Sequence, residues 1–526
     1  MPEAFSLDKS ELNLVSELEE TEGRPEPETP FRVALLGDWS GRANRHQTAT
    51  GRAADSFRAL ELDRDNFEEV LARLDVRLRL FVGNEDDPGI TLEFKELDDF
   101  HPDRIFERLE VFEALRQLRQ RLGSRETFAE AAEEVRGWTR LSSAGQATEA
   151  GRVSSEEDTE QARSLPTQDS GSLLDQLLEE AETSSVAAPR KQSSGPDDLQ
   201  ALVQNIVRPH LIEGEDPQQP ELIASVDEAT GRLMRSILHH ADFQALESAW
   251  RALYFLVSRL ETGTQLKLYL LDLSKDELVQ SLNSMDDLQS SGIYRLLVEE
   301  TTGTLGGVPW AVLAANYTFD LTLEEIELLS LAGLLARLAR APFIAAASPH
   351  FLGCHSLAST PDPDDWQRPV EAEAGPAWQA LRQQPEAAYL GLALPRFLVR
   401  LPYGAETEPT ERFDFEEMAE GASHESYLWA NPSFGCAYLL AHAFSLNGWE
   451  MRPGIVQEIE GLPLHVYREE GESRVKPCAE TLFTMRAAEQ VLNQGLMPLL
   501  SFRDSDTIRL GLFQSIAGTA LKGRWS

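Results

Sequence analysis

The sequence feature that most constrains the fold is a set of short, continuously apolar segments separated by longer segments with helical periodicity. The apolar segments are Phe31 to Leu36, Leu266 to Leu271, Trp310 to Ala315, Phe343 to Ala347 and Tyr389 to Leu394. The helical segments are Ala224 to Leu260, Leu323 to Ala339 and Glu480 to Asn493. Strands that are apolar at every position are usually covered on both faces. The pattern therefore predicts an α/β or α+β architecture with mixed sheets covered by helices.

One helical segment, Leu238 to Leu253, has a distinctive order of aromatic and aliphatic residues. Phe243, Leu246, Trp250 and Leu253 recur at steps of three and four, so they form an apolar stripe on one helical face. An ordinary core helix would explain this periodicity. The order of the residues, however, resembles the large subunit (TssC, or VipB) of the type VI secretion contractile sheath.

The same resemblance continues in order along the second half of the chain, and it spans roughly residues 172 to 515. Its further blocks are LKLYLLDLSK (266–275), GGVPWAVLAANY (306–317), RAPFIAAASP (340–349), YLGLALPRFLVRLPYG (389–404), FDFEE (413–417) and YLWAN (427–431). These blocks imply further signature core residues, namely Pro395, Arg396, Pro402, Tyr403, Gly404 and Trp429.

The first 140 residues form a separate block. It begins with the strand Phe31 to Leu36, which ends in a turn, and a helix capped by Asp63 or Asp65 is predicted over Leu62 to Val70. Apolar and polar residues then alternate over Arg77 to Val82 and Ile90 to Glu96, which predicts a hairpin. Pro102 can begin a further helix. The turn is built from Gly37, Asp38, Ser40 and Gly41. Together these features resemble the small sheath subunit (TssB, or VipA).

The two resemblances predict a fused small and large subunit with four regions. Residues 1–27 are expected to form a flexible N-terminus, 28–140 a small-subunit domain, 141–197 an acidic linker, and 198–526 a large-subunit domain. The linker is rich in Ser, Gly, Gln, Thr and Glu and cannot bury enough apolar surface to offset its ordering entropy. Because the small block has too few strands for a self-sufficient sheet, we expect the two parts to share a composite domain.

A short amphipathic helix is predicted inside the linker, at residues 172–182. It places Leu173, Leu174, Leu177 and Leu178 on one face. An isolated helix of this length is marginal in water, so it would act mainly by docking into a groove. The resemblance implies that this segment is the handle for an AAA+ unfoldase (ClpV). Docking within the same chain is the alternative.

Composition excludes some classes of partner. The chain has 526 residues, enough for two or three domains, and a formal net charge of −40. Such acidity argues against nucleic acid and against anionic membrane surfaces. The three cysteines are widely spaced and form no disulfide framework. No secretory signal and no stretch of eighteen apolar residues is found, which predicts a cytoplasmic protein.

Candidate catalytic and metal-binding motifs are weak. His350, Cys354 and His355 lack the usual ligand spacing and a fourth ligand for zinc. The segment 303–307, GTLGG, lacks the Gly-Lys-Ser/Thr ending of a phosphate loop. His239 and His240 would point about 100° apart on a helix, so capping or core packing is their expected role. No Gly-x-Ser-x-Gly elbow occurs. We therefore predict no catalytic residue, cofactor or metal.

The resemblance implies a non-catalytic sheath protomer that assembles around an inner tube. Its expected partners are other protomers, the inner tube protein, a ClpV-like unfoldase and a baseplate. Typical large subunits continue beyond the segment that matches Met497 to Ser515. This difference leaves open a protomer completed by another polypeptide, a sheath-like accessory such as a cap, adaptor or assembly regulator, and a degenerate remnant. An enzyme on the same scaffold is a further alternative, which would require a polar pocket that the sequence does not indicate.

Overall fold

The structure is a computed structural model of the chain. It describes residues 25–47, 57–82, 89–136, 202–204, 206–207, 219–283, 288–304, 306–367, 373–419, 421, 423–469 and 471–526. We call residues 25–136 the N-terminal part and residues 219–526 the C-terminal part. The predicted linker and its helix at 172–182 lie outside the described residues.

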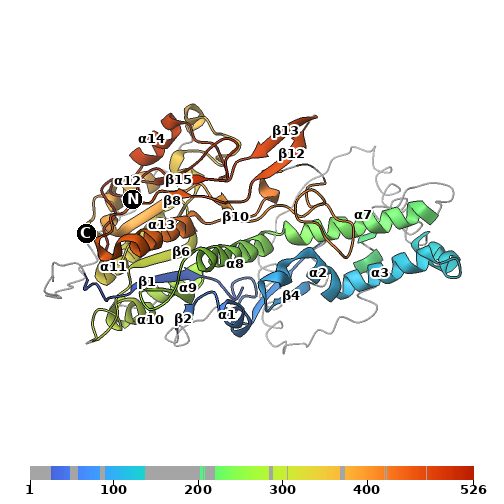
Figure 1. The fold of residues 1–526 in the computed structure, drawn as a ribbon, viewed down its shortest axis with the longest axis horizontal. Helices are drawn as coiled ribbons and strands as arrows, with labels where there is room; N and C mark the ends of the chain where they lie inside the picture. The colour runs from blue at the N-terminus through green and yellow to red at the C-terminus, as the bar shows by residue number, and fades with distance from the viewer. Residues whose placement is uncertain are drawn as a thin grey trace, which may run out of the picture.

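The centre of the molecule is a nine-stranded sheet in the order β11-β15-β14-β8-β7-β6-β1-β5-β2 (Figure 1). Its strands are β1 (Phe31–Gly37), β2 (Ala59–Leu62), β5 (Leu266–Asp272), β6 (Val312–Phe319), β7 (Phe343–Ala347), β8 (Leu390–Leu394), β11 (Glu458–Ile459), β14 (Met497–Ser501) and β15 (Ile508–Leu510). The strands from β14 to β5 are parallel, whereas β2, β11 and β15 are antiparallel to their neighbours. The predicted mixed α/β architecture is confirmed.

Strand β1 of the N-terminal part lies inside the sheet of the C-terminal part. It pairs with β5 from Phe31↔Leu266 to Gly37↔Asp272, and on its other side with β6 from Val33↔Val312 to Leu36↔Ala315. Strand β2 adds to the outer edge of β5. The two parts therefore form one composite domain, as the sequence predicted.

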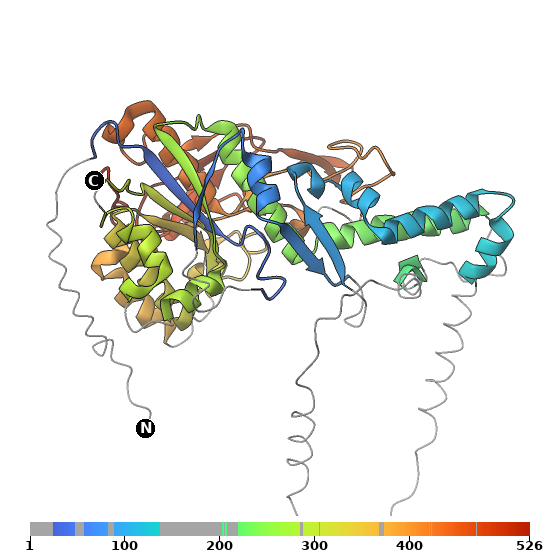
Figure 2. The same cartoon turned by 90° about the horizontal axis from the view of Figure 1, so that it is seen from below.

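Helices cover both faces of this sheet (Figure 2). On one face, Val33 and Leu35 of β1 share a core with α8 and α13, and on the other Ala34 and Leu36 share a core with α11. The helices are α1 (Phe67–Arg73), α2 (Pro102–Arg108), α3 (Glu110–Gly123), α7 (Gln219–Leu238), α8 (Ala241–Arg259), α9 (Lys275–Asn283), α10 (Gly292–Tyr294), α11 (Leu323–Ala339), α12 (Ala374–Arg382), α13 (Pro432–Asn447) and α14 (Met485–Asn493).

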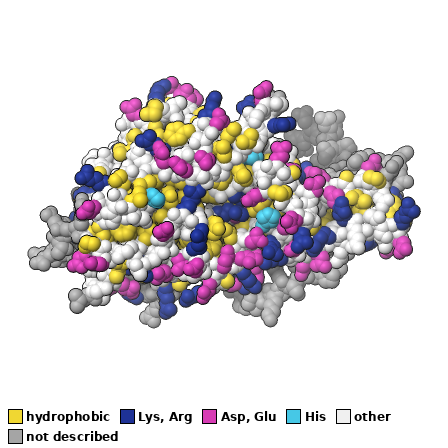
Figure 3. Space-filling view, viewed as in Figure 1, with side chains coloured by type: hydrophobic (Ala, Val, Ile, Leu, Met, Phe, Trp, Pro, Cys, Tyr) yellow, Lys and Arg dark blue, Asp and Glu magenta, His cyan; other side chains and the backbone are white. Residues whose placement is uncertain are grey.

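Three smaller sheets and a helical arm complete the described structure. The two-stranded sheets are β3 (Val76–Leu80) with β4 (Ile90–Phe94), β9 (Phe397–Leu398) with β10 (Trp429–Ala430), and β12 (His465–Glu469) with β13 (Glu472–Lys476). Helices α3 and α7 lie side by side and project from the body as an arm (Figures 1 and 2). On the face in Figure 3, acidic and basic side chains are interspersed over both the body and the arm.

Most predicted elements are confirmed, including the hairpin β3–β4 and the start of α2 at Pro102. The single helix predicted over Ala224 to Leu260 is wrong, because α7 ends at Leu238 and α8 begins at Ala241. His240 has extended backbone angles, and its Nδ1 accepts the Asp242 N–H, so it caps α8. Capping was one of the two roles expected for this histidine, and His239 instead lies 3.5 Å from the Glu417 carboxylate.

Several predicted boundaries also need correction, and three of them concern where an element starts. Leu62 ends β2, and the helix predicted from this residue starts only at Phe67; Asp63 instead accepts the N–H groups of Asp65 and Asn66 just before it. The helix predicted from Glu480 starts at Met485, where Thr484 provides the cap. The strand predicted from Trp310 starts at Val312. Among the described residues, no helix combines the length and the apolar character needed to cross a membrane.

Candidate functional site: the junction of the two parts

The turn after β1 is shaped by the residues that the sequence singled out. The Asp38 carboxylate accepts the N–H groups of Arg42 and Ala43, both at 2.9 Å. Gly41 has a φ of +72°, and a Cβ there would lie 2.5 Å from the Arg77 carbonyl oxygen. A Cβ at Gly37 would lie 2.9 Å from the Trp39 ring. Both glycines are thus required for close packing of the turn.

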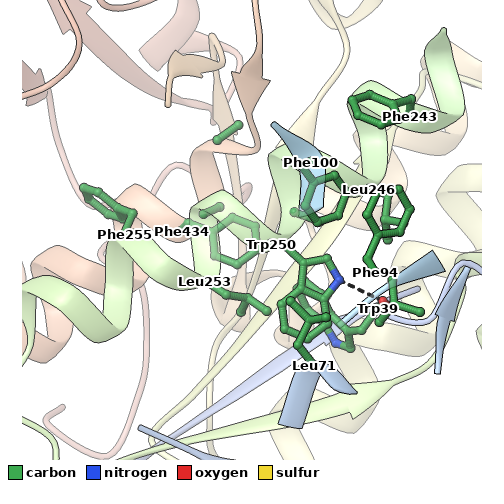
Figure 4. Close-up of a cluster of buried hydrophobic side chains, with 14 of the residues drawn as sticks. Trp39, Leu71, Phe94, Phe100, Phe243, Leu246, Trp250, Leu253, Phe255 and Phe434 are labelled. Carbon is green, nitrogen blue, oxygen red and sulfur yellow. Dashed lines mark hydrogen bonds between the residues drawn. The ribbon is translucent and has the colours of Figure 1, made fainter. Parts of the chain in front are cut away.

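Two tryptophans join this turn to α8 (Figure 4). Trp250 Nε1 donates a hydrogen bond to the Trp39 carbonyl oxygen at 2.9 Å, and the two rings meet edge to face with centroids 6.4 Å apart. Trp39 Nε1 in turn donates to the Leu271 carbonyl oxygen at 3.0 Å. Both indoles are fully buried with their N–H groups satisfied, which is the condition for a stable buried tryptophan.

The rest of the apolar stripe on α8 packs against the N-terminal part. The Phe243 ring lies 6.0 Å from the ring of Phe94 and 5.8 Å from that of Phe100, measured between centroids. Leu246 is buried in the same core cluster. The distinctive stripe of the sequence therefore packs the C-terminal part onto the N-terminal part.

Charged groups cross the same junction at the ends of β1 and β5. Asp272 accepts the N–H groups of Trp39 and Ser40 and the Ser40 hydroxyl. The Arg42 guanidinium donates to the Asp272 carbonyl oxygen at 2.8 Å and to the buried Glu277 carboxylate at 3.2 Å. Burial raises the pKa of Asp272, an effect that the Arg42 charge and the Ser40 hydrogen bonds partly offset.

A second charged network is buried beneath α8. Arg400, whose side chain is 4% exposed, lies between two fully buried carboxylates, with 2.9 Å to Glu247 and 2.8 Å to Glu417. Arg251 donates to Glu247 at 2.7 Å and to the Tyr403 hydroxyl at 2.8 Å. Buried ion pairs need this degree of hydrogen bonding to offset their desolvation.

The charge state of Glu417 follows from its contacts. Burial alone would raise its pKa, but the Arg400 charge, the His239 ring at 3.5 Å, the Arg400 hydrogen bonds and the Tyr403 N–H outweigh that effect and lower the pKa to about 2. The carboxylate is therefore ionised throughout the neutral range. It binds Arg400, which also pairs with Glu247 of α8, and it accepts the Tyr403 N–H.

The predicted signature residues separate into two groups in the structure. Gly37, Asp38, Gly41, Phe243, Leu246, Trp250 and the segment Pro402, Tyr403 and Gly404 lie around the junction. Gly404 packs so closely against Glu416 that a Cβ would collide with its carboxylate. Pro395, Arg396 and Trp429 lie elsewhere: Arg396 and Pro395 line a cavity of about 290 Å³ at the carboxyl ends of β6, β7 and β8, and Trp429 belongs to a small separate cluster.

Sequence reasoning missed the buried charged network beneath α8. Glu247, Arg400 and Glu417 were not selected as site residues, although one signal was present. Glu247 follows Phe243 by four residues and precedes Trp250 by three, so a carboxylate lies on the apolar face of the helix and must find a buried cation.

The side chains of His350, Cys354 and His355, the weak candidate for a metal site, make other contacts. His350 Nδ1 contacts the Asp320 carboxylate at 2.8 Å, and its Nε2 contacts His355 Nδ1 at 2.9 Å, while Cys354 Sγ points at the Pro349 carbonyl oxygen. Within the described ranges, no group of three or more His, Cys, Asp or Glu side chains is arranged to hold a metal ion.

Comparisons with known proteins agree with this junction of two parts. Residues 220–517 match the family VipB, described as "EvpB/VC_A0108, tail sheath N-terminal domain". Residues 7–138 match the family described as "Type VI secretion system, VipA, VC_A0107 or Hcp2". The chain is also 38% identical over 291 residues to the type VI secretion system sheath protein TssC1 of Pseudomonas aeruginosa, which covers 54% of this chain and 58% of that protein.

The chain thus spans less than two thirds of the length of that relative. The VipB match alone covers more than half of the chain. It is joined to a VipA match in the same polypeptide, so the predicted fusion is supported by both families. This chain belongs to the VipB family of tail sheath proteins.

Proposed function

We propose that the chain is a non-catalytic structural protomer of a type VI secretion sheath in which the small and large subunit parts are fused. The observation that carries this proposal is the position of β1. This strand belongs to the region that matches VipA, yet it pairs on both sides with strands of the region that matches VipB. The two parts therefore behave as one building block.

A contractile sheath requires building blocks that move as rigid bodies between an extended and a compact lattice. The Trp39–Trp250 hydrogen bond and the contacts of Arg42 with Asp272 and Glu277 supply such rigidity across the junction, and the buried Arg400 network supplies it within the C-terminal part. We propose that the partners are other protomers, an inner tube protein and a baseplate, and that assembly takes place in the cytoplasm.

The first experiment is electron microscopy of the purified full chain, alone and with a candidate inner tube protein. We expect rings or tubules that lengthen when the inner tube protein is present. Monodisperse monomers under both conditions would reject the protomer proposal. Complexes of fixed size that never lengthen would reject it in favour of a cap, adaptor or assembly regulator.

The second experiment tests whether the two parts form one unit. A protease site is inserted in residues 145–160, which lie in the predicted linker. After cleavage, we expect the two fragments to co-elute at a one-to-one ratio in size-exclusion chromatography without denaturant. Separation of two soluble fragments would show that the shared sheet is not an obligate interface.

We also propose that Leu173, Leu174, Leu177 and Leu178 form the handle for a ClpV-like unfoldase. The segment lies outside the described residues, and the proposal is supported by its apolar stripe and by the family. Substituting Leu174→Asp together with Leu178→Asp should abolish unfoldase binding in a pull-down assay. The matched control, Glu179→Gln on the polar face, should bind as the unmodified chain does. Equal binding by all three proteins would exclude the handle.

A further inference from the structure

A lysine at the end of β13 lies in an unusual setting, away from the junction. Lys476 Nζ lies 4.8 Å from the centre of the Tyr427 ring and 5.7 Å from that of Trp429, so its side chain is half-buried against two aromatic faces. The same nitrogen is 3.3 Å from His424 Nδ1. An amine is thus held within hydrogen-bond distance of an imidazole.

The imidazole is oriented by a largely buried carboxylate, whose side chain is 12% exposed. His424 Nε2 is 3.2 Å from Glu480 Oε1, and Arg396 holds Glu480 through its backbone N–H at 2.8 Å and its guanidinium at 2.6 Å. Burial alone would raise the pKa of Glu480, but the His424 hydrogen bond and the Arg396 charge lower it to about 2. An ionised carboxylate can only accept hydrogen bonds, so we assign the ring hydrogen to Nε2. Nδ1 then faces Lys476 with its lone pair.

The order carboxylate, imidazole, nucleophile is the arrangement that activates a weak nucleophile through an adjacent general base. Burial of the amine favours its neutral form, whereas the aromatic faces of Tyr427 and Trp429 favour the ammonium form. Burial lowers the pKa of Lys476, against the opposing effect of the Glu480 and Glu425 charges, and His465 is a further titratable group close to this amine.

The chain has seven lysines, and Lys9 and Lys191 lie outside the described residues. Lys476 differs in its setting from the other four described lysines, which are Lys95, Lys267, Lys275 and Lys522. Lys267 and Lys275 form ion pairs with Glu61 and Glu325, and the hydrogen bond that Lys267 donates to Glu61 raises the pKa of Lys267. The side chains of Lys95 and Lys522 are exposed. These lysines are therefore internal references against which the reactivity of Lys476 can be measured.

We propose that Lys476 is an acylation site that reacts with small acyl phosphates, with His424 as the general base. The neutral Nζ attacks the acyl carbon, a C–N bond forms, the C–O bond to phosphate breaks, and inorganic phosphate leaves. The proton lost from nitrogen passes to His424 Nδ1 and then to solvent. A small donor is required because two aromatic rings flank the amine. This inference does not depend on the sheath proposal, and the reaction would remove one positive charge from the β12–β13 hairpin.

The test is site-resolved mass spectrometry of the full chain after brief exposure to acetyl phosphate over a range of pH. At neutral pH we expect Lys476 to be acetylated faster than Lys95 and Lys522 by on the order of tenfold or more. Its rate should also reach half of its maximum at a lower pH. A rate at Lys476 equal to or below that of the two exposed lysines would overturn the proposal. A parallel reaction with acetyl coenzyme A distinguishes the donor, and modification by the thioester alone would overturn the assignment to acyl phosphates.

The variant His424→Asn tests the role of the base. Asparagine keeps an acceptor for the ammonium group but cannot take up its proton at neutral pH. We expect the rate at Lys476 to fall to that of Lys95, with unchanged rates at Lys267 and Lys522 that report an intact fold. An unchanged rate at Lys476 would exclude His424 as the base. The comparison among the lysines of the unmodified chain remains decisive if the variant does not fold.

Discussion

Replacing Glu417 with glutamine removes one charge from the buried network while keeping the shape of the side chain. In the native structure this carboxylate accepts hydrogen bonds from Arg400 at 2.8 and 3.0 Å and from the Tyr403 N–H at 2.7 Å. In the variant, an amide N–H₂ group faces the Arg400 donors in place of one oxygen. Arg400 then keeps only Glu247 as a carboxylate partner at hydrogen-bond distance among the described residues.

Two lines of reasoning give a similar magnitude for the loss of stability in this variant. The pKa of Glu417 is lowered from 4.5 to about 2, and at about 1.36 kcal/mol per unit this corresponds to roughly 3 kcal/mol of folding free energy. Removing one partner of a buried ion pair costs about 3–5 kcal/mol in other proteins. We therefore expect Glu417→Gln to lower the free energy of unfolding by about 3 kcal/mol at neutral pH.

The pH dependence of this loss has a definite sign. Because the folded-state pKa is below the unfolded value, the ionised carboxylate stabilises the protein fully above about pH 4.5, and this stabilisation is lost as the pH falls towards about 2. The variant lacks the titrating group. The difference in stability between the two proteins should thus be constant from neutral pH to about 5 and should narrow below about 4.5.

The assay is urea unfolding followed by tryptophan fluorescence at several pH values. The neighbouring variant Glu416→Gln is the matched control, since Glu416 is exposed and its substitution should change stability by less than about 1 kcal/mol. The reasoning is refuted if the free energy of unfolding falls by the same amount in both variants at neutral pH. It is also refuted if the deficit of Glu417→Gln stays constant down to pH 3.

Three further predictions concern the junction and the core. Trp250→Phe removes the hydrogen bond to the Trp39 carbonyl oxygen and leaves that buried oxygen unpaired, so urea unfolding should show a loss of about 1–3 kcal/mol. Gly41→Ala places a Cβ against the Arg77 carbonyl at positive φ and should lower the melting temperature, whereas Gly123→Ala, with open space around it, should leave it equal or higher. The three cysteines are buried, so a thiol reagent should label the native protein far more slowly than the unfolded chain.

The sequence predicts those elements whose limits are set locally. Helix α11 and strand β7 have the predicted bounds, because Thr322 caps the helix and an unbroken apolar run defines the strand. The break between α7 and α8 was missed, since the apolar periodicity continues through His239 and His240 and only the backbone geometry at His240 separates the helices. A period of 3.6 residues shows which face is buried, but it does not show where a cap interrupts the helix.

Partners distant in sequence could not be predicted in this way. The indole of Trp250 and the carbonyl of Trp39 are 211 positions apart, and Arg400 is 153 positions from Glu247. A sequence pattern can show that Glu247 lies on an apolar face, but the cation that compensates it comes from another segment that only the folded topology brings close. The family resemblance identified residues of the junction, but it did not identify the contacts between them.

The position of β1 also determines what fusion of the two parts can contribute. A flexible linker holds two partners at an effective concentration in the range of about 1 mM, which raises occupancy only when the unlinked parts would bind weakly. Strand β1 pairs along its whole length with β5 and over four positions with β6. An N-terminal part made alone would expose both edges of this apolar strand, and unpaired edges are sites of aggregation. In the fused chain the strands that cover both edges always follow on the same polypeptide, at a ratio of one to one. We infer that fusion acts mainly by protecting β1 and by fixing stoichiometry, and contributes little to the affinity of an interface that is already buried.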